Sequence, residues 1–235
     1  MDNQPKHIVI IPDGNRRWAK QKGLPSFFGH RAGAKAAEKV LKTLLDLEIP
    51  YVTFWGASLS NITKRPPEEV QALFAVYQKH FTKLAKDKKL DKYRIKVDIL
   101  GRWRELFPAD VKKPMEEALE KTKGYDGRQL TFLMAYSGTD EMVEACKNIA
   151  KAKTKNPELI IDGELLKRNL LTKDLPPVDL VIRTGGEPHW SDGLMMWDVA
   201  NAQLYFTKTL WPDFSPEECK KALEYFARAE RRMGK

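Results

Sequence analysis

The chain has 235 residues, of which 42% are hydrophobic and 31% charged, as is typical of one soluble globular domain. Its formal net charge of +9 indicates an anionic partner: nucleic acid, an acidic membrane surface or a phosphorylated metabolite. The sequence contains no apolar run long enough to span a membrane and no signal-peptide pattern, so we expect a cytoplasmic protein. Cys146 and Cys219 are too few for a disulfide framework, and both are expected on apolar helix faces as core residues.

Strand-like and helix-like segments alternate along the chain. His7–Ile11 is short, apolar and rich in β-branched residues, which predicts a buried strand that ends at Pro12. Further strands are predicted at 51–55, 95–100, 130–135, 179–182 and 204–206. Helices are predicted at 30–47, 68–84, 109–122, 139–152 (with Thr139 as N-cap), 162–170 and from 216 onward, and a loop at 56–67. This alternation predicts a single α/β domain over residues 1–235, with a central, largely parallel sheet covered by helices on both faces.

A polar cluster follows the first predicted strand directly, with the sequence Pro12-Asp13-Gly14-Asn15-Arg16-Arg17-Trp18. Open α/β sheets bind ligands at this end of their strands. A glycine lets the backbone approach a ligand, and guanidinium groups match the geometry of phosphate. The aspartate is a hard oxygen ligand of the kind that Mg²⁺ prefers. The alternative interpretation is a strand-to-helix turn with solvated arginines.

A second cluster follows the strand predicted at 179–182 and runs from Arg183 through Thr184-Gly185-Gly186-Glu187-Pro188-His189-Trp190-Ser191 to Asp192-Gly193. Paired glycines with an arginine, a histidine and a serine predict a second anion site, and the alternative is an irregular surface loop. The sequence has neither a P-loop nor a GxGxxG pattern, and its four histidines lack the spacing of zinc ligands. His80 is interpreted as structural.

Several motifs in order resemble those of the cis-prenyltransferases, whose best-known members make undecaprenyl diphosphate. They are the stretches 12–20, 29–33, 179–187, 204–206 and 210–214, and the resemblance extends in this order along nearly the whole chain. The resemblance implies a fold with an apolar substrate tunnel and a homodimer that uses Mg²⁺. It implies a reaction that joins isopentenyl diphosphate to an allylic diphosphate such as farnesyl diphosphate, with a new double bond in the cis form.

The resemblance also implies roles for single residues. Asp13 would bind Mg²⁺ and assist departure of the allylic diphosphate, and Asn61 would accept the proton. The allylic diphosphate would be held by the backbone at Gly14, Asn15, Arg16 and Arg17, by the Arg17 side chain and by His30, with Trp18 at the entrance. The pattern Ser58-x-x-Asn61 includes Ser60 and is followed by the phosphate-binding Arg65. Arg183 and Ser191 would hold isopentenyl diphosphate, and Arg232 would reach the partner subunit's site.

The sequence departs from the family pattern mainly in the second cluster. His189 takes the place of a second isopentenyl-diphosphate arginine, and Gln203 takes the place of a Mg²⁺-binding glutamate. One extra residue lies between Ser191 and Trp197, so Asp192 or Asp198 is a candidate replacement ligand. Other departures are serine at position 26, where many members have an arginine, and the stretch Ser60-Asn61-Ile62 in place of acid-Asn-Trp.

These departures leave three functional hypotheses. The first is an active enzyme that condenses the two diphosphates. The second is a non-catalytic subunit that supports an active partner, and the third is an enzyme of irregular head-to-middle prenyl coupling. A nucleic-acid-binding module is disfavoured because the aromatic residues fall on inward faces. A long lipid product and the charge of +9 suggest work near a membrane surface. The stripe Phe74, Tyr77 and Phe81 is interpreted as core, and the alternative is that it shortens the tunnel.

Overall fold

The computed structural model describes residues 4–229 and forms a single α/β domain around one six-stranded sheet. All neighbouring strands are parallel, in the order β3-β4-β2-β1-β5-β6. The strands are β1 (His7–Ile11), β2 (Tyr51–Trp55), β3 (Ile95–Leu100), β4 (Arg128–Leu133), β5 (Leu180–Arg183) and β6 (Gln203–Phe206). The predicted fold class is therefore confirmed.

The long helices and the short α9 lie close to their predicted positions, whereas α1, α3, α5 and α6 were not predicted. The helices are α1 (Asn15–Gln21), α2 (Ser26–Asp46), α3 (Leu59–Thr63), α4 (Pro67–Ala85), α5 (Lys88–Lys92), α6 (Trp103–Leu106), α7 (Ala109–Thr122), α8 (Gly138–Lys155), α9 (Gly163–Asn169) and α10 (Pro216–Arg228). Helix α3 lies inside the predicted loop, because one turn and a half is too short to show an apolar period. Ser137, and not Thr139, caps α8.

Helix α2 begins four residues before the predicted start at His30. A glycine inside a helical pattern usually weakens the prediction of a helix, but Gly29 and Gly33 here allow α1 to approach closely. A Cβ added to Gly29 would lie 2.0 Å from the backbone oxygen of Asn15. A Cβ added to Gly33 would lie 2.1 Å from the Asn15 side-chain oxygen. The two glycines therefore fix α1 against α2.

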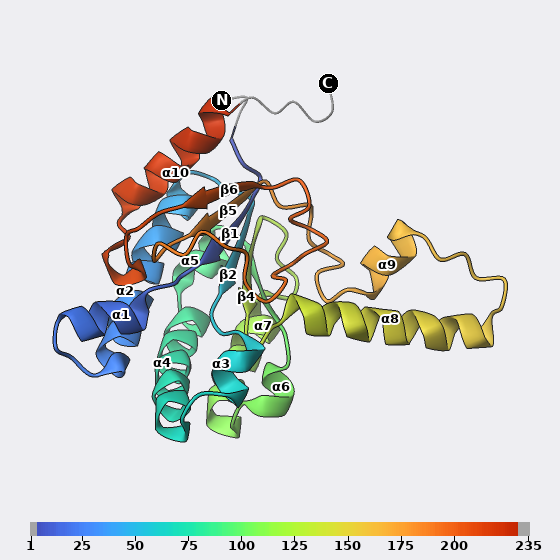
Figure 1. Ribbon diagram of the computed structural model, residues 1–235, viewed down its shortest axis with the longest axis horizontal. Helices are drawn as coiled ribbons and strands as arrows, with labels where there is room; N and C mark the ends of the chain where they lie inside the picture. Colours follow the sequence, from blue (N-terminus) through green and yellow to red (C-terminus); the bar gives the residue numbers. More distant parts are fainter. Residues whose placement is uncertain (1–3, 230–235) are drawn as a thin grey trace.

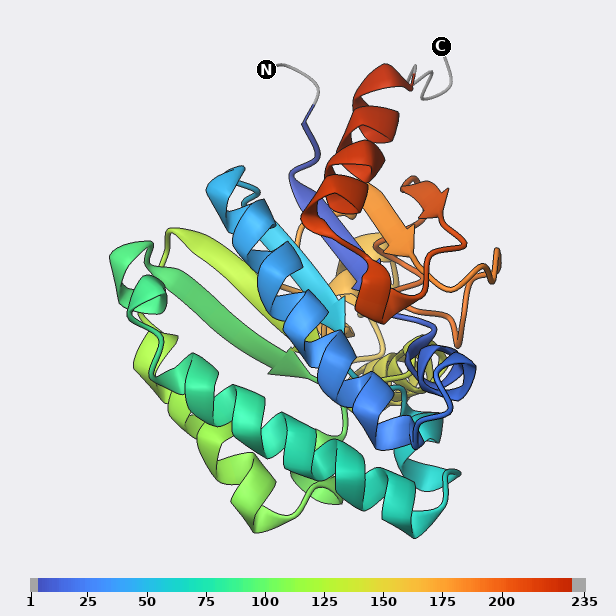
Figure 2. The same cartoon turned by 90° about the vertical axis from the view of Figure 1, so that its left-hand side faces the viewer.

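Helices α2, α4, α7 and α10 cover one face of the sheet, as Figure 2 shows. On this face the alternate strand residues Ile8, Ile10 and Phe54 pack in one core with Val40 of α2 and Phe226 of α10. The apolar residues of the other face pack against turns and irregular chain, including Leu175, Val178, Leu194, Met195 and Val199. The connection between β5 and β6 thus replaces a helix in this layer.

Helices α8 and α9 project from the body of the domain as an arm (Figure 1). Cys146 lies on α8 and is exposed, so the prediction that it is a core residue was wrong. The physical reason is that Cys146 lies on the outward face of α8, since the neighbouring Ala145 and Ile149 are buried whereas residues 146–148 are exposed. Cys219 is buried as predicted, and burial raises its pKa to about 12. Over residues 4–229, none of the helices combines the length and the apolar character that crossing a membrane requires.

Candidate active site

The two polar clusters meet because β1 and β5 are adjacent. Ile11 is paired with Arg183, so the residues that follow each strand emerge at the same edge of the sheet. The Arg183 guanidinium donates to Oδ2 of Asp13 at 3.1 Å, and the Arg17 guanidinium lies 3.2 Å from Oδ1. Arg17 also donates to the backbone oxygen of Gly185 at 2.6 Å. Asp13 and Arg17 therefore connect the two halves of the site.

Gly14 makes the turn between β1 and α1. Its φ of 109° lies in the region that favours glycine, and an added Cβ would lie 2.8 Å from a Leu210 side-chain carbon. Trp18 closes the first helical turn by donating its backbone N–H to the oxygen of Gly14 at 2.9 Å. The turn thereby brings the backbone at residues 14–17 to the edge where Arg183 emerges.

A large cavity of about 1330 Å³ begins at this edge and continues between the sheet and helices α2 and α4. Its polar end is lined by Asp13, Gly14, Asn15, Arg16, Arg17, His30, Ser58, Ser60, Asn61, Arg65, Arg183, Ser191 and Asp192. Its apolar part is lined by residues that include Leu41, Leu45, Val52, Phe54, Leu73, Val76, Tyr77, Phe81, Leu84, Leu130 and Phe132. One continuous space therefore joins a cationic end to an apolar interior.

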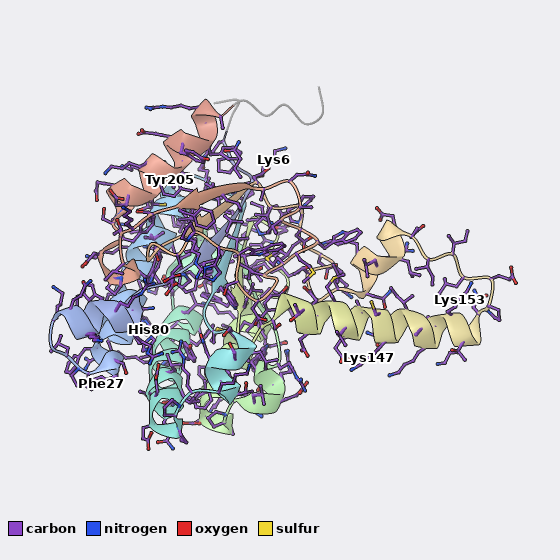
Figure 3. The ribbon with its side chains drawn as sticks, in the orientation of Figure 1. Lys6, Phe27, His80, Lys147, Lys153 and Tyr205 are labelled. Atoms are coloured by element: carbon purple, nitrogen blue, oxygen red, sulfur yellow. The ribbon has the colours of Figure 1, made fainter. Side chains whose placement is uncertain are left out.

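The aromatic stripe on α4 divides between this cavity and the core. Phe74 packs on Phe107 with ring centres 4.9 Å apart. The Tyr77 hydroxyl donates to the backbone oxygen of Gly56 at 3.0 Å, and Tyr77 and Phe81 both line the cavity. His80, labelled in Figure 3, joins α4 to α2 through Glu38 at 3.0 Å. Tyr77 and Phe81 thus serve as core and as cavity wall at once.

Arg183 is the buried cation of the site, with only 5% of its side chain exposed. One Nη donates to Asp13 and the other to the backbone oxygen of His189. Its buried Nε has no hydrogen-bond partner among the described residues. A guanidinium held in this way keeps a donor available at the edge of the cavity.

The Ser58-x-x-Asn61 pattern forms a capping box at the start of α3. Oγ of Ser58 accepts from the backbone N–H of Asn61 at 3.0 Å, and the Asn61 side-chain oxygen accepts from the backbone N–H of Ser58 at 3.4 Å. The Ser58 and Ser60 hydroxyl oxygens lie 2.9 Å apart. The pattern therefore has a structural role, and it also holds three polar side chains on the cavity wall.

His30 lies on α2 with 11% of its side chain exposed. Burial, followed by the nearby Arg65, lowers the pKa of its imidazole to about 4, so the ring is neutral at pH 7. Its Nε2 lacks a hydrogen-bond partner within the described chain. A neutral imidazole that lines the cavity can donate one hydrogen bond to an anion there.

Three residues that the sequence assigned to the site lie outside the cavity lining. The Trp18 indole donates to Asp213 at 2.8 Å and is not part of the cavity lining. His189 is outside the lining and is half exposed, 3.7 Å from Glu187. Gln203 is paired with Leu180 at the amino ends of β5 and β6, opposite the edge that carries Asp13. Arg232 lies outside the described residues.

The two aspartates that could replace the missing glutamate have different surroundings. Asp198 is buried in an ion pair with Lys167, which leaves it away from the cavity. Asp192 lines the cavity, but its carboxylate accepts from Ser137 at 2.9 Å at the start of α8. Glu69 and Glu187 contact the site arginines and were not singled out from the sequence. The i,i+4 spacing of Arg65 and Glu69 was a signal that could have identified the first.

The family model for the putative undecaprenyl diphosphate synthases matches residues 11–234. The chain belongs to this family. It is 37% identical over 230 residues to the isoprenyl transferase of Thermotoga maritima, covering 98% of this chain and 97% of that protein. It is 36% identical to the tritrans,polycis-undecaprenyl-diphosphate synthase (geranylgeranyl-diphosphate specific) of Pyrococcus horikoshii, covering 98% of this chain and 87% of that protein.

A solved structure of the same kind is that of lavandulyl diphosphate synthase from Lavandula x intermedia in complex with dimethylallyl diphosphate. It matches with a TM-score of 0.91 and 27% identity, and the match covers 100% of both chains. The resemblance to cis-prenyltransferases is therefore confirmed, and the chain is related throughout to enzymes that transfer prenyl groups.

The donor atoms of this prenyltransferase site fit Mg²⁺ in one particular way. Mg²⁺ is commonly held by one or two carboxylates together with substrate phosphates and water. The Asp13 carboxylate is about a third exposed at the polar end of the cavity. Within residues 4–229, the side chains form no group of three or more metal ligands. The site thus fits an ion that arrives with a diphosphate and takes one protein carboxylate.

Proposed function

We propose that the chain condenses isopentenyl diphosphate with an allylic diphosphate in the presence of Mg²⁺ and forms a cis-prenyl or polyprenyl diphosphate. The observation that carries this proposal is the continuous cavity, whose polar end collects Asp13, Arg17 and Arg183 and whose remainder is apolar. A diphosphate fits the first part and a hydrocarbon chain fits the second. The family membership of the chain supports the same reaction.

The allylic diphosphate is proposed to bind at the turn after β1. The backbone at Gly14, Asn15 and Arg16 would receive its oxygens, together with the Arg17, His30 and Arg65 side chains. Negative charge develops on this diphosphate as it departs, and fixed cations stabilise such charge without reorganising. Asp13 would hold Mg²⁺, which supplies additional positive charge to the departing group when it is bound.

Isopentenyl diphosphate is proposed to bind on the other side of Asp13, at Arg183 and Ser191. Arg183 is fixed by Asp13 and by the His189 carbonyl, so its remaining donors are already oriented. His189 lies on the same loop and would contribute a weaker contact in place of an arginine, because an imidazole has fewer N–H donors. The two neighbouring anion sites would orient the reacting carbons and avoid the entropic cost of a bimolecular encounter.

In the proposed step the carbon–oxygen bond of the allylic diphosphate breaks, and its electron pair leaves with inorganic diphosphate. A carbon–carbon bond to isopentenyl diphosphate forms, and the acceptor loses one proton. Asn61, with Ser58 and Ser60 beside it, is proposed to receive that proton or pass it to a diphosphate oxygen. A weak base is sufficient because the cationic intermediate is strongly acidic.

A homodimer is also proposed. Strand β6 is an edge of the sheet, and Leu204 and Phe206 on it are 42% and 36% exposed. An exposed apolar edge strand is a surface that proteins usually cover. Gln203 also lies on the edge strand β6. In a dimer this residue could approach the active site of the partner subunit. Light scattering of the purified chain would give a mass of twice 27.0 kDa for a dimer, and a monomer would contradict the proposal.

We propose that the enzyme is cytoplasmic and works at a membrane surface. The net charge of +9 supports weak attraction to anionic lipid, and lysines such as the exposed Lys147 and the partly buried Lys153 lie on the α8 arm (Figure 3). Sedimentation with vesicles that contain anionic lipid, compared with neutral vesicles, tests this. Equal recovery of the protein in both supernatants would contradict it.

Irregular coupling of two allylic diphosphates is the second candidate. His189 in place of an arginine weakens the expected acceptor site, and the chain shares its fold with lavandulyl diphosphate synthase. A non-catalytic role is less well supported, because Asp13, Arg17 and Arg183 form a connected set of ion pairs at the polar end of the cavity.

One experiment separates these candidates. The purified protein is incubated with Mg²⁺ and labelled isopentenyl diphosphate, together with dimethylallyl, farnesyl or geranylgeranyl diphosphate. Products that grow in five-carbon steps are expected for condensation. A product formed from dimethylallyl diphosphate in the absence of isopentenyl diphosphate would identify irregular coupling. No product in any combination would overturn both and favour a non-catalytic subunit.

A further inference from the structure

Glu69 contacts side chains from three parts of the proposed binding site for the allylic diphosphate, which donates the prenyl group. Its Oε1 lies 2.8 Å from the Arg65 guanidinium, 3.4 Å from Nε of Arg16 and 3.8 Å from Nε2 of His30. Arg16 belongs to α1, His30 belongs to α2, and Arg65 lies between α3 and α4. One carboxylate oxygen is therefore the point at which these segments converge.

Glu69 does not itself face the cavity. Arg16, His30 and Arg65 all line its polar end, whereas Glu69 is absent from the lining. Only 11% of the Glu69 side chain is exposed. The carboxylate thus contacts the three side chains from behind, where it does not occupy the space of a bound anion.

We propose that Glu69 is a positioning residue for the allylic diphosphate, which it serves by holding Arg65 and Arg16 in one arrangement at the cavity wall, beside the neutral His30. The inference rests on the proposed function and deepens it. An arginine uses one or two of its five donors on a carboxylate and keeps the others for a phosphate. Long side chains lose conformational freedom when they bind, and a partner that already fixes them removes part of that cost.

The place of Glu69 in the fold makes the carboxylate suitable for this task. It lies in the first turn of α4, where the helix dipole stabilises negative charge. Arg16 and Arg65 repel each other. The Glu69 carboxylate lies between them and is mostly buried, so solvent screens its negative charge only weakly. Removal of the carboxylate would release the two guanidinium groups from each other and from His30.

The test uses the Glu69→Gln and Glu69→Ala variants, with Glu68→Gln as the matched control. Glu68 belongs to the same helical turn and is exposed. Binding of farnesyl and geranylgeranyl diphosphate is measured by calorimetry with Mg²⁺, and the KM of each substrate is measured separately. We expect about tenfold weaker allylic binding for both Glu69 variants, with an isopentenyl diphosphate KM within about twofold of the parent protein.

The control variant should bind as the parent does, and a thermal melt checks that each variant is folded. Unchanged or tighter allylic binding by Glu69→Gln would overturn the inference, since tighter binding identifies the carboxylate as a competing anion. An equal loss for both substrates would also overturn it, because a structural role affects the whole site. If the parent protein neither binds an allylic diphosphate nor makes a product, the proposed function fails, which is a different result.

Discussion

The two halves of the site, which share Asp13, are built in different ways. The donor half, which is the proposed site of the allylic diphosphate, takes Arg16, Arg17 and His30 from helices α1 and α2, and Arg65 from the short connection between α3 and α4. The acceptor half has one buried arginine, Arg183, followed by irregular chain as far as β6. Helices fix the directions of their side chains, whereas irregular chain relies on tertiary contacts.

The acceptor loop is held by hydrogen bonds from outside itself. The Tyr136 hydroxyl accepts from the backbone N–H of Met195 at 3.2 Å and donates to the buried Glu141 at 2.5 Å. Met195 has a φ of 44° and Asp192 a φ of 50°, which is a strained region for residues other than glycine. The comparison indicates that binding of the allylic diphosphate (the donor) depends on several cations. Binding of isopentenyl diphosphate (the acceptor) depends on one arginine and on the anchoring of its loop.

The largest expected effect comes from the residue that joins the two halves. Asp13→Ala should lower product formation by at least about 1000-fold, because it removes the carboxylate proposed for Mg²⁺ and frees both arginines. Incorporation of labelled isopentenyl diphosphate measures this, and circular dichroism checks the fold. Asp213→Ala, which removes a carboxylate outside the cavity lining, is the control. Activity within tenfold of the parent would contradict the role of Asp13.

Separate arginine variants should divide the two halves. Arg183→Gln is expected to raise the KM of isopentenyl diphosphate by about 100-fold and change allylic binding much less, since it removes a buried charged donor. Arg65→Gln, which removes a cavity-lining guanidinium that does not contact the acceptor loop, should show the opposite pattern. Steady-state kinetics with each substrate varied in turn measures both. If each variant weakens both substrates equally, the division into halves is wrong.

The neutral imidazole in the donor half predicts a dependence of stability on pH. The pKa of His30 is lowered to about 4, so between pH 6.5 and 4 the unfolded chain binds more protons than the folded one. The stability of the parent should therefore fall as the pH falls through this window, by on the order of 2 kcal/mol between pH 7 and 5. Urea unfolding at both values, with His30→Gln as control, measures it. An equal loss for both proteins would contradict the assignment.

The smallest expected effect is tighter binding of isopentenyl diphosphate in the acceptor half of the site. His189→Arg should lower the KM of isopentenyl diphosphate by roughly three- to tenfold, because a guanidinium carries a permanent charge and offers more hydrogen-bond donors to a phosphate than an imidazole does. The same kinetic assay measures the change, and the KM of the allylic diphosphate is the internal control. A higher KM for isopentenyl diphosphate would show that the loop does not bring position 189 to that substrate.

Local patterns in the sequence were sufficient for the parallel α/β fold and for much of the site. β1 and β5 were predicted because their residues are continuously apolar, and polar clusters after such strands must meet when the strands are neighbours. Asp13, Arg17 and Arg183 were identified in this way. The short helices α1, α3, α5 and α6 were missed because four to seven residues are too few to repeat an apolar pattern, and the start of α2 was missed because its glycines serve contact with α1.

The sequence by itself determined the family, the order of the elements and the residue types that can bind two diphosphates. Tertiary structure decided which of these residues share one cavity. Trp18 and Gln203 lie outside the lining, because the direction of a side chain and the end of a strand are set by packing across the sheet. The spacing of Arg65 and Glu69 was a local signal, but the contacts of Glu69 with Arg16 and His30 became visible only in the fold, which brings α1 and α2 to its carboxylate. Contacts between distant segments have no periodic signal in the chain, and for that reason they require the folded molecule.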